Sequence, residues 1–285
     1  MSLMNSKRLN AAARSSVRLI THWTQHAVCG NAEIPAHHDA FIRVRHFHNR
    51  LDLGAFREAL QACERALRRW PEDALTNSLF ADLCVVAYYT GLALIDSPLQ
   101  RAEKAACDAV ALQPAYHFTR FALGKVYFAK GERGPCLAEF GRCLALNPYS
   151  ASVGAWIGMY LCLLGDWERG RQLVTASRAL TPDNVVYHFT LALAHYRQGA
   201  FEAAWTEARR LHMPDLFWDS LVRAACLGQL SRRAEAQREL TELLRLCPDF
   251  KTRGRAHLRR LLFSEDNVAM LMDGLHKAGF ADAAQ

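Results

Sequence analysis

The chain has 285 residues, of which 51% are hydrophobic and 22% charged, and its formal net charge is +7. This composition is typical of a folded globular chain and excludes extensive disorder. The positive charge is concentrated at the ends: residues 1–50 and residues 251–263 each carry a net +5, the tail from Ser264 carries −3, and residues 51–250 sum to zero. A uniformly basic surface that coats nucleic acid is therefore not expected.

Residues 4–39 are expected to form an N-terminal amphipathic helix and a linker. Apolar residues recur every three or four positions between residues 6 and 28, which predicts a helix with one apolar face. Within it, His22 and His26 lie one turn apart, a spacing that lets two imidazoles share a metal ion. No cysteine or carboxylate lies at a sequence spacing from this pair that would supply further metal ligands, so no metal site is expected. Self-association through this helix remains an alternative to its folding back on the chain, which leaves the oligomeric state open.

A period of 34 residues organises the middle of the chain. Prolines mark it at Pro71, Pro114, Pro148, Pro182, Pro214 and Pro248, with one interval of 32 residues and one of 43. Gly131, Gly165 and Gly199 repeat at 34 residues in a constant phase. Each interval is interpreted as two helices, because glycine permits the tight turn between them and proline ends the second helix.

Small residues recur where the two helices of a unit must touch. In the first helices they are Gly124, Gly158, Ala192 and Ala224, and in the second helices they are Ala59, Cys136, Gly170, Ala204 and Ala236. A large side chain at either position would force the helix axes apart.

These features resemble the tetratricopeptide repeat, a 34-residue helix–turn–helix unit. The stretch RFALGKVYFAKGERGPCLAEFGRCLALNP is a near-complete instance. Six units are predicted at 40–73, 74–116, 117–150, 151–184, 185–216 and 217–250, the second enlarged around Gly91–Gln100. Residues 251–285 are expected to form capping helices, with Ser264 as an N-cap. The resemblance implies an all-α fold, a superhelical solenoid with capping helices at both ends.

The enlarged unit and the final Asp273–Gly279 segment resemble the repeat region of certain bacterial regulators. In those proteins the repeats follow an OmpR-type winged-helix DNA-binding domain or an adenylate/guanylate cyclase domain. Neither domain is recognisable in this sequence. The resemblance implies the sensory or partner-binding part of a cytoplasmic transcriptional or signalling regulator, with its output domain on the same or a partner chain.

The first helix of each unit is expected to line a concave groove. Aromatic side chains together with a lysine and an arginine suit a bound protein or peptide. The candidate partner-binding residues are Phe118, Phe121, Lys125, Phe128, Met159, Phe189, Tyr196, Arg197 and Trp218.

A second candidate site is the basic cluster near the C-terminus, which consists of Lys251, Arg253, Arg255, Arg259 and Arg260. Clustered cations bind phosphate, so the alternative function is binding of nucleic acid or of another anionic surface. Aromatic stacking partners are sparse around it, so nucleic acid is the less favoured partner.

No catalytic motif is found: the sequence contains no P-loop, dinucleotide-binding, nucleophile-elbow or His-Glu-x-x-His pattern. Neither an enzymatic activity nor a cofactor is therefore expected.

Nine cysteines are present without a Cys-x-x-Cys pair. Those in apolar helical stretches are expected to be buried and reduced, as in cytosolic proteins: Cys63, Cys84, Cys107, Cys136, Cys143, Cys162 and Cys226. The most apolar segment, residues 79–95, falls short of the ~20 residues that span a bilayer. It is expected to be a buried helix, and no membrane span is predicted.

Overall fold

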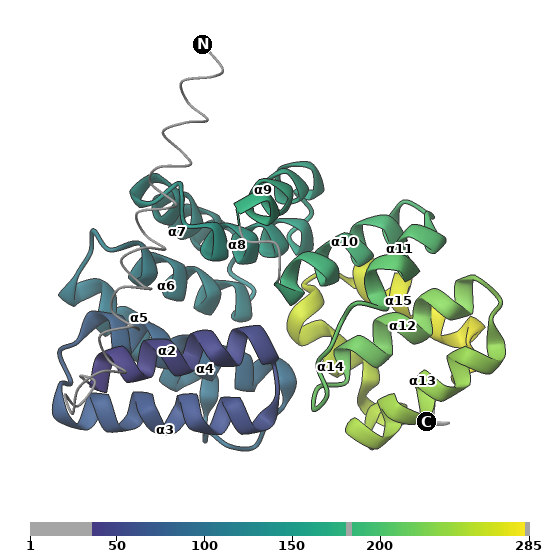
Figure 1. The fold of residues 1–285 in the computed structure, drawn as a ribbon, viewed down its shortest axis with the longest axis horizontal. Coiled ribbons are helices and arrows are strands. Elements are labelled where there is room, and N and C mark those ends of the chain that lie inside the picture. Colours follow the sequence, from purple (N-terminus) through teal and green to yellow (C-terminus); the bar gives the residue numbers. More distant parts are fainter. Residues whose placement is uncertain (1–35, 181–183, 283–285) are drawn as a thin grey trace, which may run out of the picture.

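A computed structural model describes residues 36–180 and 184–282, which form fourteen α-helices and no β-strand (Figure 1). The helices are α2 (Ala36–Arg50), α3 (Leu53–Arg69), α4 (Ala74–Thr90), α5 (Pro98–Leu112), α6 (His117–Ala129), α7 (Arg133–Leu146), α8 (Ala151–Leu163), α9 (Trp167–Leu180), α10 (Val185–Arg197), α11 (Phe201–Ala208), α12 (Trp218–Gln229), α13 (Arg233–Leu246), α14 (Phe250–Leu262) and α15 (Glu265–Lys277). The helix predicted over residues 6–28, with His22 and His26, lies outside the described residues.

The two helices of each unit pack as a hairpin, which gives the pairs α2–α3, α4–α5, α6–α7, α8–α9, α10–α11 and α12–α13. Four of the connections within these pairs contain glycine with positive φ: Gly91 at 72°, Gly131 at 78°, Gly165 at 97° and Gly199 at 75°. Glycine adopts this backbone with the least strain, which explains why Gly131, Gly165 and Gly199 recur at 34-residue spacing. The equivalent turns α2–α3 and α12–α13 instead hold Leu51 and Ser231 at positive φ.

Close contacts between paired helices occur at the predicted small residues. A Cβ on Gly124 would lie 2.6 Å from the ring of Phe140 on α7. A Cβ on Gly158 would lie 2.7 Å from the carbonyl oxygen of Gly170 on α9. These separations are below any real Cβ contact, so the helix pairs α6–α7 and α8–α9 depend on these glycines.

Helix starts are capped by side chains at several units. The carboxylates of Asp52 and Asp73 accept hydrogen bonds from the backbone of α3 and α4, and Ser264 does the same for α15. The predicted N-cap role of Ser264 is therefore confirmed. Glu265 and Asp266 follow it in the first turn, where the helix dipole favours negative charge.

Helix α4 is buried on nearly all sides, because it packs against α2, α3, α5, α6 and α14. It contains most of the apolar segment 79–95, so the prediction of a buried helix there is confirmed. Among the described residues, no helix combines the length and hydropathy that crossing a membrane requires.

The described cysteines are all free thiols, and most are buried. The prediction of burial is wrong for Cys107, whose side chain is exposed on α5. Its helix face carries Glu103, Lys104 and Asp108 beside it, which makes this face polar rather than apolar.

The last two helices turn back onto the array instead of extending it (Figure 1). Helix α15 packs along α12, while α14 contacts α4, which lies far earlier in the chain. A hydrogen bond of 2.8 Å from the Leu53 amide to the Asp215 carboxylate closes the opposite side between α3 and the α11–α12 connection. The superhelix is therefore compact, and its C-terminal helices contact its early units.

Candidate binding surface

Three polar side chains on successive first helices meet inside the early part of the array. His48 on α2, Asp82 on α4 and Lys125 on α6 are 34 and 43 residues apart, the length of one ordinary and one enlarged unit. They therefore occupy equivalent repeat positions, and the superhelix stacks them next to one another.

The Asp82 carboxylate is shared by both bases of this cluster. One oxygen forms an ion pair with the Lys125 ammonium, and the other lies 2.5 Å from His48 Nε2. Lys125 is only 1% exposed, and its ammonium also faces the rings of Phe121 and Trp156, with centroids 5.6 and 5.8 Å away. The charge of Lys125 is thus fully compensated within the chain.

Burial sets the ionisation of this cluster. Burial, together with the neighbouring Lys125 charge, lowers the pKa of His48 to about 3, so its ring is neutral. Burial also lowers the pKa of Lys125, and the Asp82 carboxylate opposes that shift. One carboxylate cannot keep two buried bases protonated, and the lysine, with the higher intrinsic pKa, retains the proton. The cluster therefore links α2, α4 and α6 through a buried ion pair and a buried hydrogen bond.

Half-buried aromatic side chains lie at the start of the first helices, and we call Phe41, Tyr116, His117 and Phe118 the aromatic rim. The Phe118 ring is edge-on to Phe41 of α2, with centroids 6.0 Å apart. It also contacts the rings of Tyr116 and His117 at 5.5 and 4.3 Å. Because the Phe41 and Phe118 rings meet between α2 and α6, the rim is a continuous aromatic surface that retains partial solvent exposure.

Most of the nine groove residues predicted from sequence are packed inside the chain. Phe121, Lys125, Phe128, Met159, Phe189, Tyr196 and Trp218 are all buried, Phe118 is half-buried and Arg197 is exposed. Arg197 lies over the Trp167 ring, 5.3 Å from its centroid. The partner-binding role of these nine residues stays a prediction, and the described conformation presents only Phe118 and Arg197 to a partner.

The C-terminal helices cover residues of both middle and late units that were predicted to line the groove. The Phe128 ring packs on Phe263, which follows α14, with centroids 5.3 Å apart. The Tyr196 hydroxyl donates to the Met270 carbonyl oxygen of α15 and accepts from Gln229 Nε2 at 3.0 Å. A long trough that opens along the whole array is therefore absent from the described part of the chain.

The basic cluster lies on α14 and is partly neutralised. Arg259 forms an ion pair with Glu265 at 2.5 Å, and Arg253 lies 3.8 Å from Asp249. Arg260 lies over the Tyr88 ring of α4, 5.9 Å from its centroid. Lys251 and Arg255 are exposed on the same helix.

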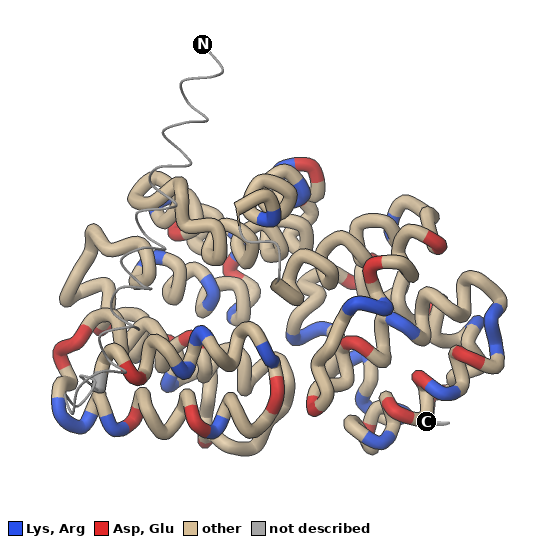
Figure 2. The backbone as a smooth tube through the Cα atoms, in the orientation of Figure 1, with Lys and Arg blue, Asp and Glu red and all other residues tan. Residues whose placement is uncertain are grey.

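Acidic and basic positions are interspersed over the array (Figure 2).

Exposed apolar residues at the ends of the second helices are not among the residues predicted from the sequence to bind a partner. Leu112, Leu146 and Leu180 each end such a helix, are 39–43% exposed and are separated by 34 residues. Tyr149, which follows Leu146 in the chain, is 61% exposed. The repeat spacing itself placed these leucines along one edge, so the signal was present in the sequence.

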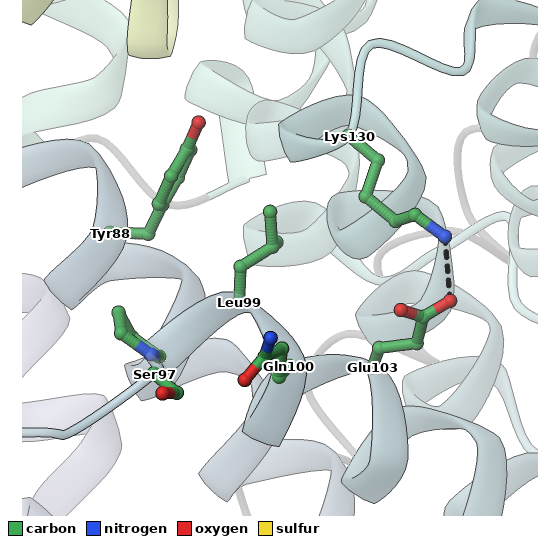
Figure 3. Close-up of a pocket in the computed structure, with 7 residues that line it drawn as sticks. Tyr88, Ser97, Leu99, Gln100, Glu103 and Lys130 are labelled. Atoms are coloured by element: carbon green, nitrogen blue, oxygen red, sulfur yellow. Dashed lines mark hydrogen bonds and ion pairs between the residues drawn. The ribbon is translucent and has the colours of Figure 1, made fainter.

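A pocket of ≈ 360 Å³ lies where α4 ends and α5 begins (Figure 3). Its lining consists of Tyr88, Ser97, Pro98, Leu99, Gln100, Glu103 and Lys130. The wall contributed by Ser97 belongs to the extra residues of the enlarged unit. Its charged groups already pair with each other, since Lys130 Nζ lies 2.6 Å from Glu103. The pocket is a mainly apolar hollow without a free charged group that would orient a ligand.

Comparison with protein-family profiles and with curated protein sequences gives no match. Solved structures do match. IFIT1, as a monomeric mutant with Gppp-AAAA, is similar over 80% of this chain and 56% of its own, with 15% identity and a TM-score of 0.59. The APC/C hetero-tetramer Cut9–Hcn1 is similar over 79% of this chain and 49% of its own, with 13% identity and a TM-score of 0.54.

A third solved structure is TTC0263, a tetratricopeptide protein of Thermus thermophilus. It covers 73% of this chain and 99% of its own, with 19% identity and a TM-score of 0.49. This chain spans about half the length of IFIT1 and of the matched Cut9–Hcn1 chain. At these identities the likeness concerns the fold alone. The described residues have the all-α superhelical fold of tetratricopeptide-repeat proteins.

Proposed function

We propose that this chain is a non-catalytic scaffold that binds a protein or peptide partner at the aromatic rim. The observation that carries the proposal is the half-exposed surface formed by Phe41, Tyr116, His117 and Phe118 across two helices that are far apart in sequence. Large aromatic side chains are the residues that contribute most to protein interfaces. A partner that inserts apolar or aromatic side chains between these rings suits this surface.

Two features restrict where a partner binds. Helix α15 covers α12 and the Tyr196 side of α10, and α14 with Phe263 covers parts of α4 and α6, so a peptide running along the whole array requires those helices to move away. The Lys125 ammonium is paired with Asp82 and does not offer a free charge. The rim is therefore the part of the inner face that a rigid chain presents.

We infer a regulatory setting from the resemblance of the enlarged unit and the Asp273–Gly279 segment to bacterial regulators. In this setting, partner binding changes the activity of a winged-helix or cyclase output domain on the same or a partner chain, in the cytoplasm. Self-association of the chain is compatible with this scheme.

The proposal is tested with peptides selected from a phage-displayed random library on the wild-type chain. We expect the selected peptides to lose at least about tenfold in affinity for Tyr116→Ala/Phe118→Ala, because truncation of an aromatic hot-spot residue at an interface costs about 2 kcal/mol or more. Leu94→Ala is the matched control, since Leu94 is also an exposed apolar residue but lies on the α4–α5 connection. Equal binding by the double variant and the wild type, with an unchanged circular dichroism spectrum, would refute the proposal.

The alternative function uses the basic cluster of α14 to bind nucleic acid or another anionic surface. The ion pairs of Arg253 and Arg259 reduce the charge that is free to contact phosphate. A titration of the chain with duplex DNA at two salt concentrations tests this alternative, because phosphate contacts weaken steeply with salt. Tight binding at low salt that is lost in Lys251→Ala/Arg255→Ala would support it.

A further inference from the structure

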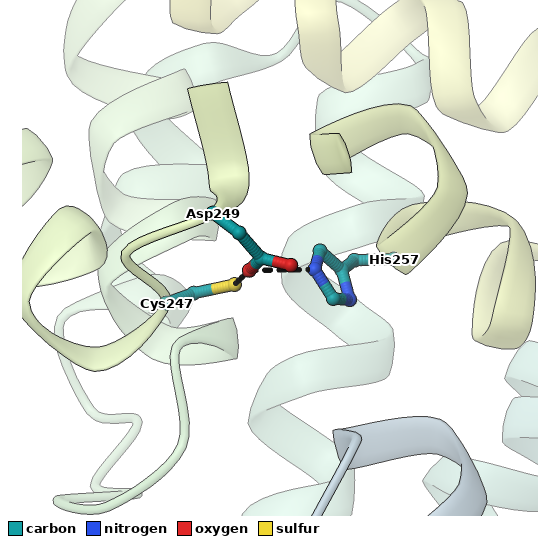
Figure 4. A group of neighbouring side chains, drawn as sticks. All are labelled: Cys247, Asp249 and His257. Atoms are coloured by element: carbon teal, nitrogen blue, oxygen red, sulfur yellow. Dashed lines mark hydrogen bonds and ion pairs between the residues drawn. The ribbon is translucent and has the colours of Figure 1, made fainter. Parts of the chain in front are cut away.

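Three side chains with different donor atoms converge at the junction between the last repeat unit and α14 (Figure 4). Cys247 and Asp249 lie in the turn between α13 and α14, and His257 lies two turns into α14. Cys247 Sγ, one Asp249 oxygen and a ring nitrogen of His257 all lie within 4.8 Å of one another. The turn therefore folds a thiol, a carboxylate and an imidazole around one point.

The carboxylate of Asp249 lies between the other two groups. Its Oδ1 atom is 3.3 Å from Cys247 Sγ and 2.9 Å from His257 Nε2. Cys247 and His257 are 7% and 8% exposed, whereas the Asp249 side chain is 45% exposed. The site thus has a buried inner wall and one side open to solvent.

The Asp249 side chain does not cap α14 with a hydrogen bond, although the residue occupies the N-cap position of that helix. By contrast, Asp52, Asp73, Asn184 and Ser264 each cap their own helix through the side chain. An N-cap aspartate that caps its helix stabilises it by about 1 kcal/mol. The Asp249 carboxylate forgoes this interaction and faces Cys247 and His257 instead.

The donor set and its spacing match those of zinc. Zinc binds thiolate sulfur, imidazole nitrogen and carboxylate oxygen at about 2.0–2.3 Å, so a tetrahedral ion holds its ligand atoms roughly 3.3–3.6 Å apart. The two distances from Asp249, 3.3 and 2.9 Å, need to change by only a few tenths of an ångström. The thiol and the imidazole, which lie within 4.8 Å of one another, need to move together to about 3.5 Å as the ion binds. A thiolate and an imidazole disfavour calcium and magnesium, which prefer oxygen ligands.

The charges around the site compensate a bound ion. A zinc ion with one thiolate, one carboxylate and one neutral imidazole is electrically neutral. Arg253 and Arg260 face the thiol, and their charge favours its deprotonated form. Against this, burial and Asp249 raise the pKa of Cys247 to about 12, so the thiol keeps its proton until a metal ion displaces it.

The ring of His257 is held from the opposite side. It packs against Phe217, with ring centroids 6.0 Å apart, and its Nδ1 atom is buried without a hydrogen-bond partner. With zinc on Nε2 the ring proton resides on Nδ1. In that tautomer Nδ1–H is a buried donor without an acceptor, so the bond from zinc to Nε2 has to offset the cost of the unpaired donor.

We propose that Cys247, Asp249 and His257 bind one zinc ion, with water as the fourth ligand on the side open to solvent. Binding releases the Cys247 thiol proton to solvent and shifts the imidazole proton from Nε2 to Nδ1. The ion joins the end of the repeat array to α14, the helix that contacts α4. The site therefore stabilises the C-terminal closure of the superhelix.

The test uses the full chain, stripped of metal by dialysis against a chelator and titrated with zinc in competition with a chromophoric chelator. We expect one zinc ion per chain to be bound and the thermal midpoint to rise with zinc, because the ion binds only the folded site. Cobalt in place of zinc should give a thiolate-to-cobalt charge-transfer absorption band. That band reports the cysteine ligand and distinguishes this site from histidine-only binding elsewhere.

Matched variants locate the ion. In Cys247→Ser, we expect the cobalt band to disappear and zinc affinity to fall by at least about tenfold, the lower end of the loss seen when even an outer-shell partner is removed. Asp249→Asn should weaken zinc binding while the band persists. Cys107→Ser, which removes an exposed thiol of α5, should behave as the wild type. The absence of a cobalt–thiolate band in the wild type, or its persistence in Cys247→Ser, would overturn the proposal.

Discussion

Gly228 of α12 and Gly274 of α15 are in backbone contact. A Cβ added to Gly228 would overlap the Gly274 carbonyl oxygen and lie 2.6 Å from the amide nitrogen of Ala278. Helix α15 ends just beyond this contact. Gly279 follows its end with φ of 97°, a backbone conformation that glycine adopts more readily than any other residue. The glycines of the Asp273–Gly279 segment therefore serve close helix packing and helix termination.

Gly274→Ala should loosen α15 from α12. The new methyl group would clash with the Tyr196 hydroxyl and lie 2.7 Å from the Ala225 carbonyl oxygen. Overpacking of this kind costs about 1–3 kcal/mol, so we expect the free energy of unfolding, measured in urea, to fall by that amount. Gly141→Ala is the control, since Gly141 is exposed in α7 and no atom outside its own stretch of helix lies within 4 Å of its Cβ position. It should stabilise the chain by roughly 0.5–1 kcal/mol. An unchanged midpoint for Gly274→Ala would contradict this packing.

Lys125→Met should be strongly destabilising because it leaves the buried Asp82 carboxylate without its cation. Breaking a buried ion pair in this way costs about 3–5 kcal/mol, which urea unfolding at neutral pH measures. Removing both charges in Asp82→Asn/Lys125→Met leaves no buried charge uncompensated, so the double variant should be more stable than Lys125→Met alone. A double variant whose loss equals the sum of the two single losses would show that the two side chains do not interact.

Acidification should destabilise the chain through His48. Its folded-state pKa of about 3 is lower than its ordinary value of 6.5, so below pH 6.5 the unfolded chain takes up a proton that the folded chain does not. Stability is therefore lost as the pH falls from 6.5 toward 3, with a slope of up to about 1.4 kcal/mol per pH unit from this residue. Urea midpoints between pH 7 and 4.5 should fall more steeply for the wild type than for His48→Phe. Parallel pH profiles would show that His48 is not the group that titrates.

The architecture was predictable because the repeat places the same constraint at the same position many times. Gly131, Gly165 and Gly199 each require a positive φ, and each ends the first helix of a unit. A pattern that recurs at 34 residues is difficult to produce by any other fold. The turns between the helices therefore followed from a few glycines and prolines.

Whether the inner face of the superhelix is open or covered was not predictable from the 34-residue period. Whether Phe128 or Tyr196 faces a partner or the chain itself depends on where α14 and α15 return, and those helices lie outside the repeat. The local pattern of α15 predicts a helix with one apolar face but does not specify which surface that face covers. The approach of Cys247, Asp249 and His257 likewise depends on a turn outside any helical period.

Cys107 should be the most reactive of the described thiols. It is exposed on α5, whereas Cys63, Cys84, Cys136, Cys143, Cys162, Cys226 and Cys247 are buried. Its reaction should still be slower than that of a free thiol, because partial burial and the nearby Glu103 and Asp108 raise its pKa and only the thiolate reacts. In a Cys29→Ser background, a disulfide reagent that releases a coloured thiol should show one fast equivalent per native chain. Cys107→Ser should abolish this fast equivalent, and the remaining thiols should react only as urea unfolds the chain. A second fast equivalent that survives in Cys107→Ser would mean that one of the buried cysteines is reached by solvent in the native state.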